Sequence, residues 1–131
     1  MEVLERRRRE REERLKRARR FAEAIRREVS PASVVVIGST ARGDFNAWSD
    51  IDVVIVSPKF PKNPLKRYEM LESHLEPGIE PIPLRPEDLE RLVERGAPVV
   101  EDLLRGVVLF DDLGVLGRLS EGGAGRARLN Y

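Results

Sequence analysis

The sequence predicts a small α/β domain of the α+β kind, in which helices cover one face of a twisted mixed sheet. Three segments support this prediction. Ser33–Ile37 is an uninterrupted, mostly β-branched run, which is typical of a central strand buried on both faces. Ile51–Val56 is a second such run. Ile79–Leu84 carries prolines at two alternate positions, which removes backbone donors from one side only and indicates an edge strand.

A long charged helix is expected over residues 2–29. An apolar stripe at spacings of three and four along its second half should dock on the sheet. Glu5–Arg14 contains no apolar residue, so its helix would depend on acid–base pairs four residues apart, each worth roughly 0.3 kcal/mol. Two interpretations of this half stay open: a solvated helix, or an arm that binds nucleic acid or a partner subunit. The stripe consists of Leu15, Ala18, Ala22, Ile25 and Val29.

Local signals predict the remaining elements. Leu65–Leu75 has helical spacing and precedes Pro77-Gly78, a strong turn signal. Pro86 opens a helix with acids in its first turn. The chain would then consist of the charged helix (residues 1–30), one body (31–120) and a Gly-rich flexible tail (121–131). Also expected are a helical turn at Ser39–Arg42, a helix at Pro98–Leu104, a strand at Val107–Phe110 and a weak helix at Leu113–Leu119.

Composition excludes several classes of site. With 131 residues the chain is large enough for one core but too small for a separate substrate-binding domain. It has no cysteine and a single histidine, His74, so disulfides, thiolate metal sites and histidine-rich metal sites are excluded. No apolar run approaches membrane-spanning length and the N-terminus is charged, so we expect a cytoplasmic protein. Residues 1–30 hold 12 Lys and Arg against 7 Asp and Glu, so the arm is basic.

The most informative stretch links the first two strands. Gly38-Ser39 follows the first strand, and Asp50 and Asp52 flank the start of the second, ten residues later. Residues two apart on an extended chain point to the same face, so the two carboxylates should lie side by side. Such a pair repels unless a cation binds it, and a Gly-Ser step offers accessible backbone amides that suit a phosphate. The pattern therefore indicates metal-assisted phosphoryl or nucleotidyl transfer.

This spacing resembles the signature of the nucleotidyltransferases of the DNA polymerase β-like superfamily. Ala41-Arg42-Gly43 and Ser49 resemble its small branch, the minimal nucleotidyltransferases. The resemblance implies that Asp50, Asp52 and a third carboxylate on a neighbouring strand bind two divalent ions, Mg²⁺ or alternatively Mn²⁺.

For the third carboxylate we expect Glu80, which begins the third strand, with Glu76 as its rival. The resemblance also implies that Gly38 and Ser39 hold the β- and γ-phosphates of a nucleoside triphosphate. Arg42 either reaches a phosphate or is a surface charge. Trp48 either stacks on a base or covers the core.

The activity implied by the resemblance is transfer of AMP from ATP to a hydroxyl of a partner macromolecule. That partner could be a toxin of the HEPN-domain type, which relatives neutralise by adenylylating a tyrosine, and this would make the chain an antitoxin. Two alternatives remain: an antitoxin that binds its partner without catalysis, and a nucleic-acid-binding module that uses the basic arm. A homo-oligomer is compatible with all three.

Overall fold

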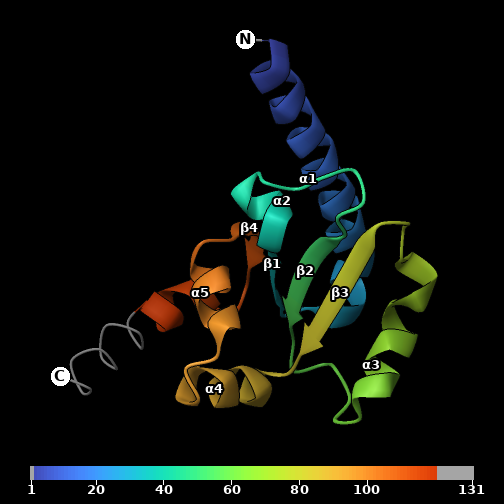
Figure 1. Cartoon of the computed structure of the whole chain (residues 1–131). Helices are drawn as coiled ribbons and strands as arrows, with labels where there is room; N and C mark the ends of the chain where they lie inside the picture. Colours follow the sequence, from blue (N-terminus) through green and yellow to red (C-terminus); the bar gives the residue numbers. More distant parts are fainter. Residues whose placement is uncertain (1, 121–131) are drawn as a thin grey trace, which may run out of the picture.

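The computed structural model describes residues 2–120 and contains one four-stranded sheet in the order β3-β2-β1-β4 (Figure 1). The strands are β1 (Ser33–Ile37), β2 (Ile51–Val56), β3 (Ile79–Leu84) and β4 (Val107–Asp111). β1 is antiparallel to both β2 and β4, whereas β2 and β3 are parallel. The mixed α/β fold expected from the sequence is therefore confirmed.

The strand positions follow from the residues. Every residue of β1 is buried, as expected for a central strand. β3 lies at an edge of the sheet, because Pro81 and Pro83 have no backbone donor for a second neighbour. The carbonyl oxygen of Pro83 instead accepts a hydrogen bond of 3.1 Å from the buried guanidinium of Arg67. The edge expected from the two prolines is confirmed.

The helices also form close to where the sequence predicts them, and three of them begin with a proline at a position that needs no backbone donor. The tail expected at 121–131 lies outside the described residues. Residues 115–120 are helical. The other helices are α1 (Glu2–Val29), α2 (Gly38–Arg42), α3 (Pro64–Leu71), the short 3₁₀ turn η1 (Glu72–His74), α4 (Pro86–Glu94) and α5 (Pro98–Leu104).

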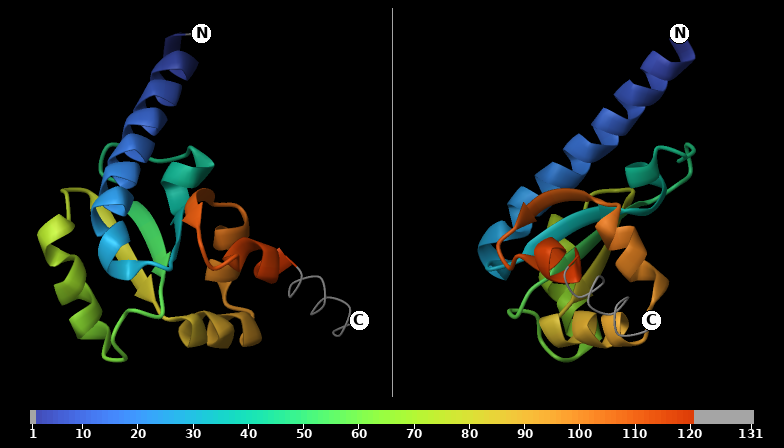
Figure 2. Two further views of the ribbon diagram at one scale, coloured as in Figure 1. Left: turned by 180° about the vertical axis from the view of Figure 1, so that it is seen from behind. Right: turned by 90° about the vertical axis from the view of Figure 1, so that its left-hand side faces the viewer.

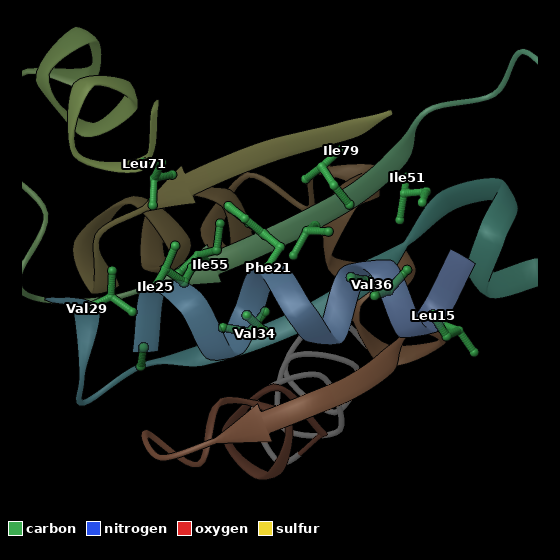
Figure 3. Packing of buried hydrophobic residues seen from close by; sticks show 14 of the residues in the cluster. Leu15, Phe21, Ile25, Val29, Val34, Val36, Ile51, Ile55, Leu71 and Ile79 are labelled. Carbon is green, nitrogen blue, oxygen red and sulfur yellow. The ribbon is translucent and has the colours of Figure 1, made fainter. Parts of the chain in front are cut away.

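α1 packs its apolar stripe on one face of the sheet, as Figure 3 shows. Phe21 and Ile25 of α1 are fully buried and lie in one cluster with Val34, Val36 and other strand residues. Burying one such large apolar side chain contributes about 2 kcal/mol to stability. This contact fixes the second half of α1 firmly to the sheet, as the stripe predicted.

The opposite face of the sheet is covered as well, which corrects the expectation of helices on one face. Val35 and Val54 pack in a second cluster with Leu89 of α4 and Leu103 of α5, separate from the cluster that contains α1. Figure 2 shows the ribbons of α4 and α5 on the side of the sheet away from α1. The physical reason is that β1 and most of β2 carry apolar side chains at successive positions. Exposing either face of these strands to water is unfavourable, so both faces need a covering layer.

The first half of α1 extends past the sheet (Figure 1) but is not simply solvated. The expected acid–base pairs four residues apart are absent from residues 2–120. Pairs three residues apart are present instead, such as Arg7–Glu10 at 3.6 Å. The side chains of Arg7 and Arg14 form hydrogen bonds with the loop that follows α2, and Arg11 forms hydrogen bonds with carbonyl oxygens of α2 itself.

Candidate active site

The acids meet on the face of the sheet that α4 and α5 cover. Asp52 lies opposite Ile37 of β1 and beside Glu80 of β3 in the strand register. Side chains alternate along β2, and Val54, two residues further on, packs in the cluster beneath α4 and α5. Asp52 is half-buried, whereas Glu80 and Asp50, the residue before β2, are exposed. The strands therefore place the carboxylates of Asp52 and Glu80 side by side at a rim of the sheet.

Gly38 lies directly against Asp52. Its φ is +73°, a left-handed conformation that residues with a side chain rarely adopt. A Cβ at this position would stand 2.7 Å from Oδ2 of Asp52, which is closer than any real contact. Glycine is thus required twice, for the turn from β1 into α2 and for the close approach of the carboxylate.

The acids influence one another electrostatically. Burial, followed by the charges of Asp50 and Glu80, raises the pKa of Asp52 above its ordinary value. The charge of Arg42 opposes this shift, so the guanidinium lies near enough to Asp52 to act on it. Arg42 also forms an exposed ion pair with Asp44 at 3.2 Å. It is therefore a surface residue whose charge also acts on Asp52.

A further carboxylate, Asp102 of α5, also raises the pKa of Asp52. Sequence reasoning missed it, because Asp102 lies 50 positions after Asp52 on a helix without a recognisable motif. Gly106 lets the end of α5 approach the sheet, since a Cβ there would meet the carbonyl oxygen of Val36 at 2.7 Å. Only the packing of α5 on β1 reveals this fourth acid.

The donor set fits a hard divalent cation, but it is not assembled as a finished metal site. Carboxylate oxygens are the ligands that Mg²⁺ and Ca²⁺ prefer. Among the residues that the structure describes, no three His, Cys, Asp or Glu side chains converge closely enough to hold one ion. Asp52 and Glu80 therefore share a face, with Asp50 in the loop just before β2, and the three do not form the closed triad that we expected. Repulsion between like charges opposes closer approach, and rotation of exposed carboxylates would be needed for joint binding.

Glu76, the rival to Glu80, has another partner. Its carboxylate accepts a hydrogen bond from Arg20 of α1 at 3.0 Å. Glu80 has no such partner among the described residues and lies in register with Asp52. The geometry thus favours Glu80 as the third acid.

Trp48 is 92% exposed at the turn between α2 and β2, so the interpretation that it covers the core is wrong. The neighbouring Phe45 is the buried aromatic residue of this loop, with 2% of its surface exposed. The base-stacking interpretation of Trp48 stays a prediction.

An apolar hollow of about 450 Å³ lies between α4 and residues 113–119, lined by Leu89, Val93 and Leu119 among others. None of the acids described above belongs to its lining. The hollow is therefore separate from the chemistry that the acids can perform.

Comparison with known proteins identifies the family of the chain. Residues 18–105 match the family of the nucleotidyltransferase domain, and the chain belongs to this family. Domains of this family act on a nucleotide substrate and generally use divalent metal ions.

A solved structure supports the fold. It is the crystal structure of a Sulfolobus solfataricus protein provisionally assigned as a nucleotidyltransferase. The TM-score is 0.58 and the identity is 22%, and the match covers 77% of this chain and 83% of that protein. A search among curated proteins gave no significant match. No helix within residues 2–120 is both long and apolar enough to cross a membrane.

Proposed function

We propose that the protein transfers AMP from ATP to a hydroxyl group of a partner macromolecule. The observation that carries this proposal is the placement of Asp52 between Gly38 and Glu80: the glycine leaves room for the carboxylate, and the parallel register of β2 and β3 sets Glu80 beside it. A pair of surface acids would need neither the left-handed glycine nor the shared face.

Each residue has a role in the proposed reaction. Asp50, Asp52 and Glu80 hold two Mg²⁺ ions, with Mn²⁺ as a substitute. Bound ions of this kind neutralise charge on the triphosphate and lower the pKa of an attacking hydroxyl. Gly38 and Ser39 contact the β- and γ-phosphates, and Arg42, whose charge acts on Asp52, adds positive charge for a phosphate.

In the reaction, the acceptor oxygen forms a bond to the α-phosphorus while the bond from that phosphorus to the bridging oxygen breaks and pyrophosphate leaves. The acceptor we propose belongs to another macromolecule, since residues 31–120 form one sheet with its covering helices. A protein tyrosine is the acceptor we propose, and a HEPN-domain toxin is the partner suggested by the resemblance of the sequence to minimal nucleotidyltransferases. The protein would then act as an antitoxin through covalent modification.

The test is a labelling reaction with ATP that carries the label on either the α- or the γ-phosphate, in the presence of Mg²⁺ and a HEPN-domain protein. Nucleotidyl transfer predicts that the α-label enters the acceptor, that the γ-label does not, and that EDTA abolishes labelling. Asp52→Asn should remove labelling, whereas Glu69→Gln should keep it, because Glu69 is exposed on α3 against the other face.

Entry of the γ-label would show phosphoryl transfer and contradict the proposal. Binding of the HEPN-domain protein without labelling, equally strong in the wild type and in Asp52→Asn, would favour the alternative of an antitoxin that acts by contact alone.

A further inference from the structure

The loop that joins the two halves of the site has no regular structure of its own. It runs from the end of α2 to Asp50, and residues 44–50 form neither helix nor strand. Irregular connections of this kind are usually the most mobile parts of a domain. A site that requires Asp50 at a fixed distance from Asp52 therefore needs something to hold this loop in place.

Two arginines of α1, Arg7 and Arg14, supply such contacts to the loop, and a third, Arg11, bonds α2, the helix from which the loop starts. Arg7, Arg11 and Arg14 follow one another at spacings of four and three, so they lie on one face of the helix. All three donate hydrogen bonds to backbone carbonyl oxygens between residues 40 and 49, across a sequence separation of about 30 residues. The acceptors are Phe45 for Arg7, Thr40 (3.0 Å) and Ala41 (2.8 Å) for Arg11, and Asn46 (2.8 Å) and Ser49 (2.9 Å) for Arg14.

Phe45 completes the contact. The guanidinium groups of Arg7 and Arg14 both lie 4.4 Å from the centre of its ring, one cation–π contact each. The ring is 2% exposed, so the loop is anchored by a buried side chain as well as by its carbonyl oxygens. Hydrogen bonds from a charged donor are roughly twice as strong as neutral ones.

Arg14 reaches closest to the acids. It donates to the carbonyl oxygen of Ser49, the residue directly before Asp50, and to the hydroxyl of Thr40, which follows Gly38-Ser39. One side chain thus connects the backbone before Asp50 with a side chain of α2, the helix that begins at Gly38. A salt bridge to an acid does not explain this arginine, since none forms within residues 2–120.

We infer that Arg7, Arg11 and Arg14 are positioning residues, which hold the loop so that Asp50 stays in place relative to Asp52 and Gly38. We call this set of contacts the arginine brace. The effect on catalysis rests on the proposed function. The effect on the mobility of the loop can be measured even if the protein transfers no nucleotide. The charged half of α1 is then part of the active-site architecture rather than a separate binding arm.

The chain offers a matched control. Replacing Arg7, Arg11 and Arg14 by glutamine removes three positive charges together with the contacts to the loop. Replacing Arg6, Arg8 and Arg9 by glutamine removes the same charge from the same half of α1, but these exposed side chains form no hydrogen bond to α2 or the loop. A third variant, Arg14→Lys, keeps the charge and the helix and loses only the planar pair of donors.

The experiment measures backbone hydrogen exchange of residues 40–50 and the fluorescence anisotropy of Trp48, the single tryptophan, in all four proteins. In the brace triple variant, exchange of residues 40–50 should rise about 10-fold or more while exchange of β1 and β2 stays within about 2-fold, and the anisotropy should fall. The control triple variant should match the wild type. Arg14→Lys should lie between them.

Nucleotide-transfer assays on the same proteins test whether the arginine brace matters for catalysis. The brace variant should lose about 10- to 100-fold in kcat, as expected when a reacting group shifts by up to 1 Å. It should also need more Mg²⁺ for half-maximal rate, a change that loss of global stability alone would not cause.

Unchanged exchange of residues 40–50 in the brace variant overturns the inference, whether or not the wild type transfers nucleotides. Raised exchange with full kcat and an unchanged Mg²⁺ requirement also overturns it. An equal loss of transfer in the control triple variant would show that the charge of the arm matters and the brace does not. Absence of transfer in the wild type refutes the proposed function, and the exchange comparison then decides on the brace alone.

Discussion

Gly38→Ala is the substitution that tests the geometry of the site most sharply. The left-handed backbone at Gly38 costs a residue with a Cβ roughly 1–2 kcal/mol. A drop of that size lowers the melting temperature of a chain of this length by about 3–8 °C. The new Cβ would also stand 2.7 Å from Oδ2 of Asp52, whereas ordinary contact begins at 3.4 Å, so the carboxylate must retreat by about 0.7 Å.

That displacement should change the free energy of unfolding little and lower the transfer rate strongly. Oδ2 is the far end of a side chain, and Asp52 forms no side-chain hydrogen bond within the described residues, so it can rotate away without breaking a contact. A shift of this size at a metal ligand should cost about 10-fold or more in transfer rate. Gly43→Ala is the matched control, because Gly43 has φ of +89° but nothing lies within 4 Å of its Cβ position.

The assay combines thermal melting with the rate of Mg²⁺-dependent labelling from α-labelled ATP. Both variants should lose similar stability, since both adopt the same strained backbone, and only Gly38→Ala should lose most of its activity. Equal activity in the two variants would refute the reasoning, because it would show that the contact between Gly38 and Asp52 has no part in the chemistry.

Three further predictions concern stability. Arg67→Met should lower the free energy of unfolding by about 3 kcal/mol in urea titrations, because the buried guanidinium bonds the carbonyl oxygens of Pro61, Lys62 and Pro83 and is one of two arginine partners of Asp88; a loss below about 1 kcal/mol would contradict this. Burial, then Asp50 and Glu80, raises the pKa of Asp52, so the folded protein retains a proton that the unfolded chain releases. Without metal, stability should therefore fall as pH rises from about 3.9 toward the raised pKa, and Asp52→Asn should lack this fall and be at least as stable as the wild type. Deleting residues 2–12 should lower the melting temperature measurably, since the contacts of Arg7 with the loop and of Arg11 with α2 are lost; an unchanged value would mean that these contacts contribute nothing.

Much of the fold could be predicted because its signals are local. A continuous apolar strand such as β1 has to be central, and alternate prolines have to lie at an edge. The two aspartates and the glycine stand out by residue type and spacing, whereas the register of β2 and β3 pairs Glu80 with Asp52 and not with Asp50, the residue with which the prediction had compared it.

What could not be predicted depends on contacts between segments far apart in the sequence. The arginines of α1 look like solvated charges until the loop is placed beside them, because an arginine that binds a carbonyl oxygen leaves no pattern in the sequence of the acceptor. Asp102 joins the site only through the packing of α5. The covering of the second face was deducible in principle from the apolar residues on both sides of β1, but the single-face expectation overlooked them.

The measurement that tests the central claim most directly is the melting temperature with and without Mg²⁺ plus ATP, compared between the wild type and Asp52→Asn. A ligand that binds only the folded state at 100 times its dissociation constant stabilises it by about 2.7 kcal/mol, which raises the melting temperature by roughly 10 °C. We expect this rise in the wild type and in Glu69→Gln, and little or none in Asp52→Asn. If the melting temperatures of the wild type and Asp52→Asn respond identically to Mg²⁺ plus ATP, Asp52 takes no part in binding these ligands. The acids at the rim of the sheet are then not a metal-dependent nucleotide site.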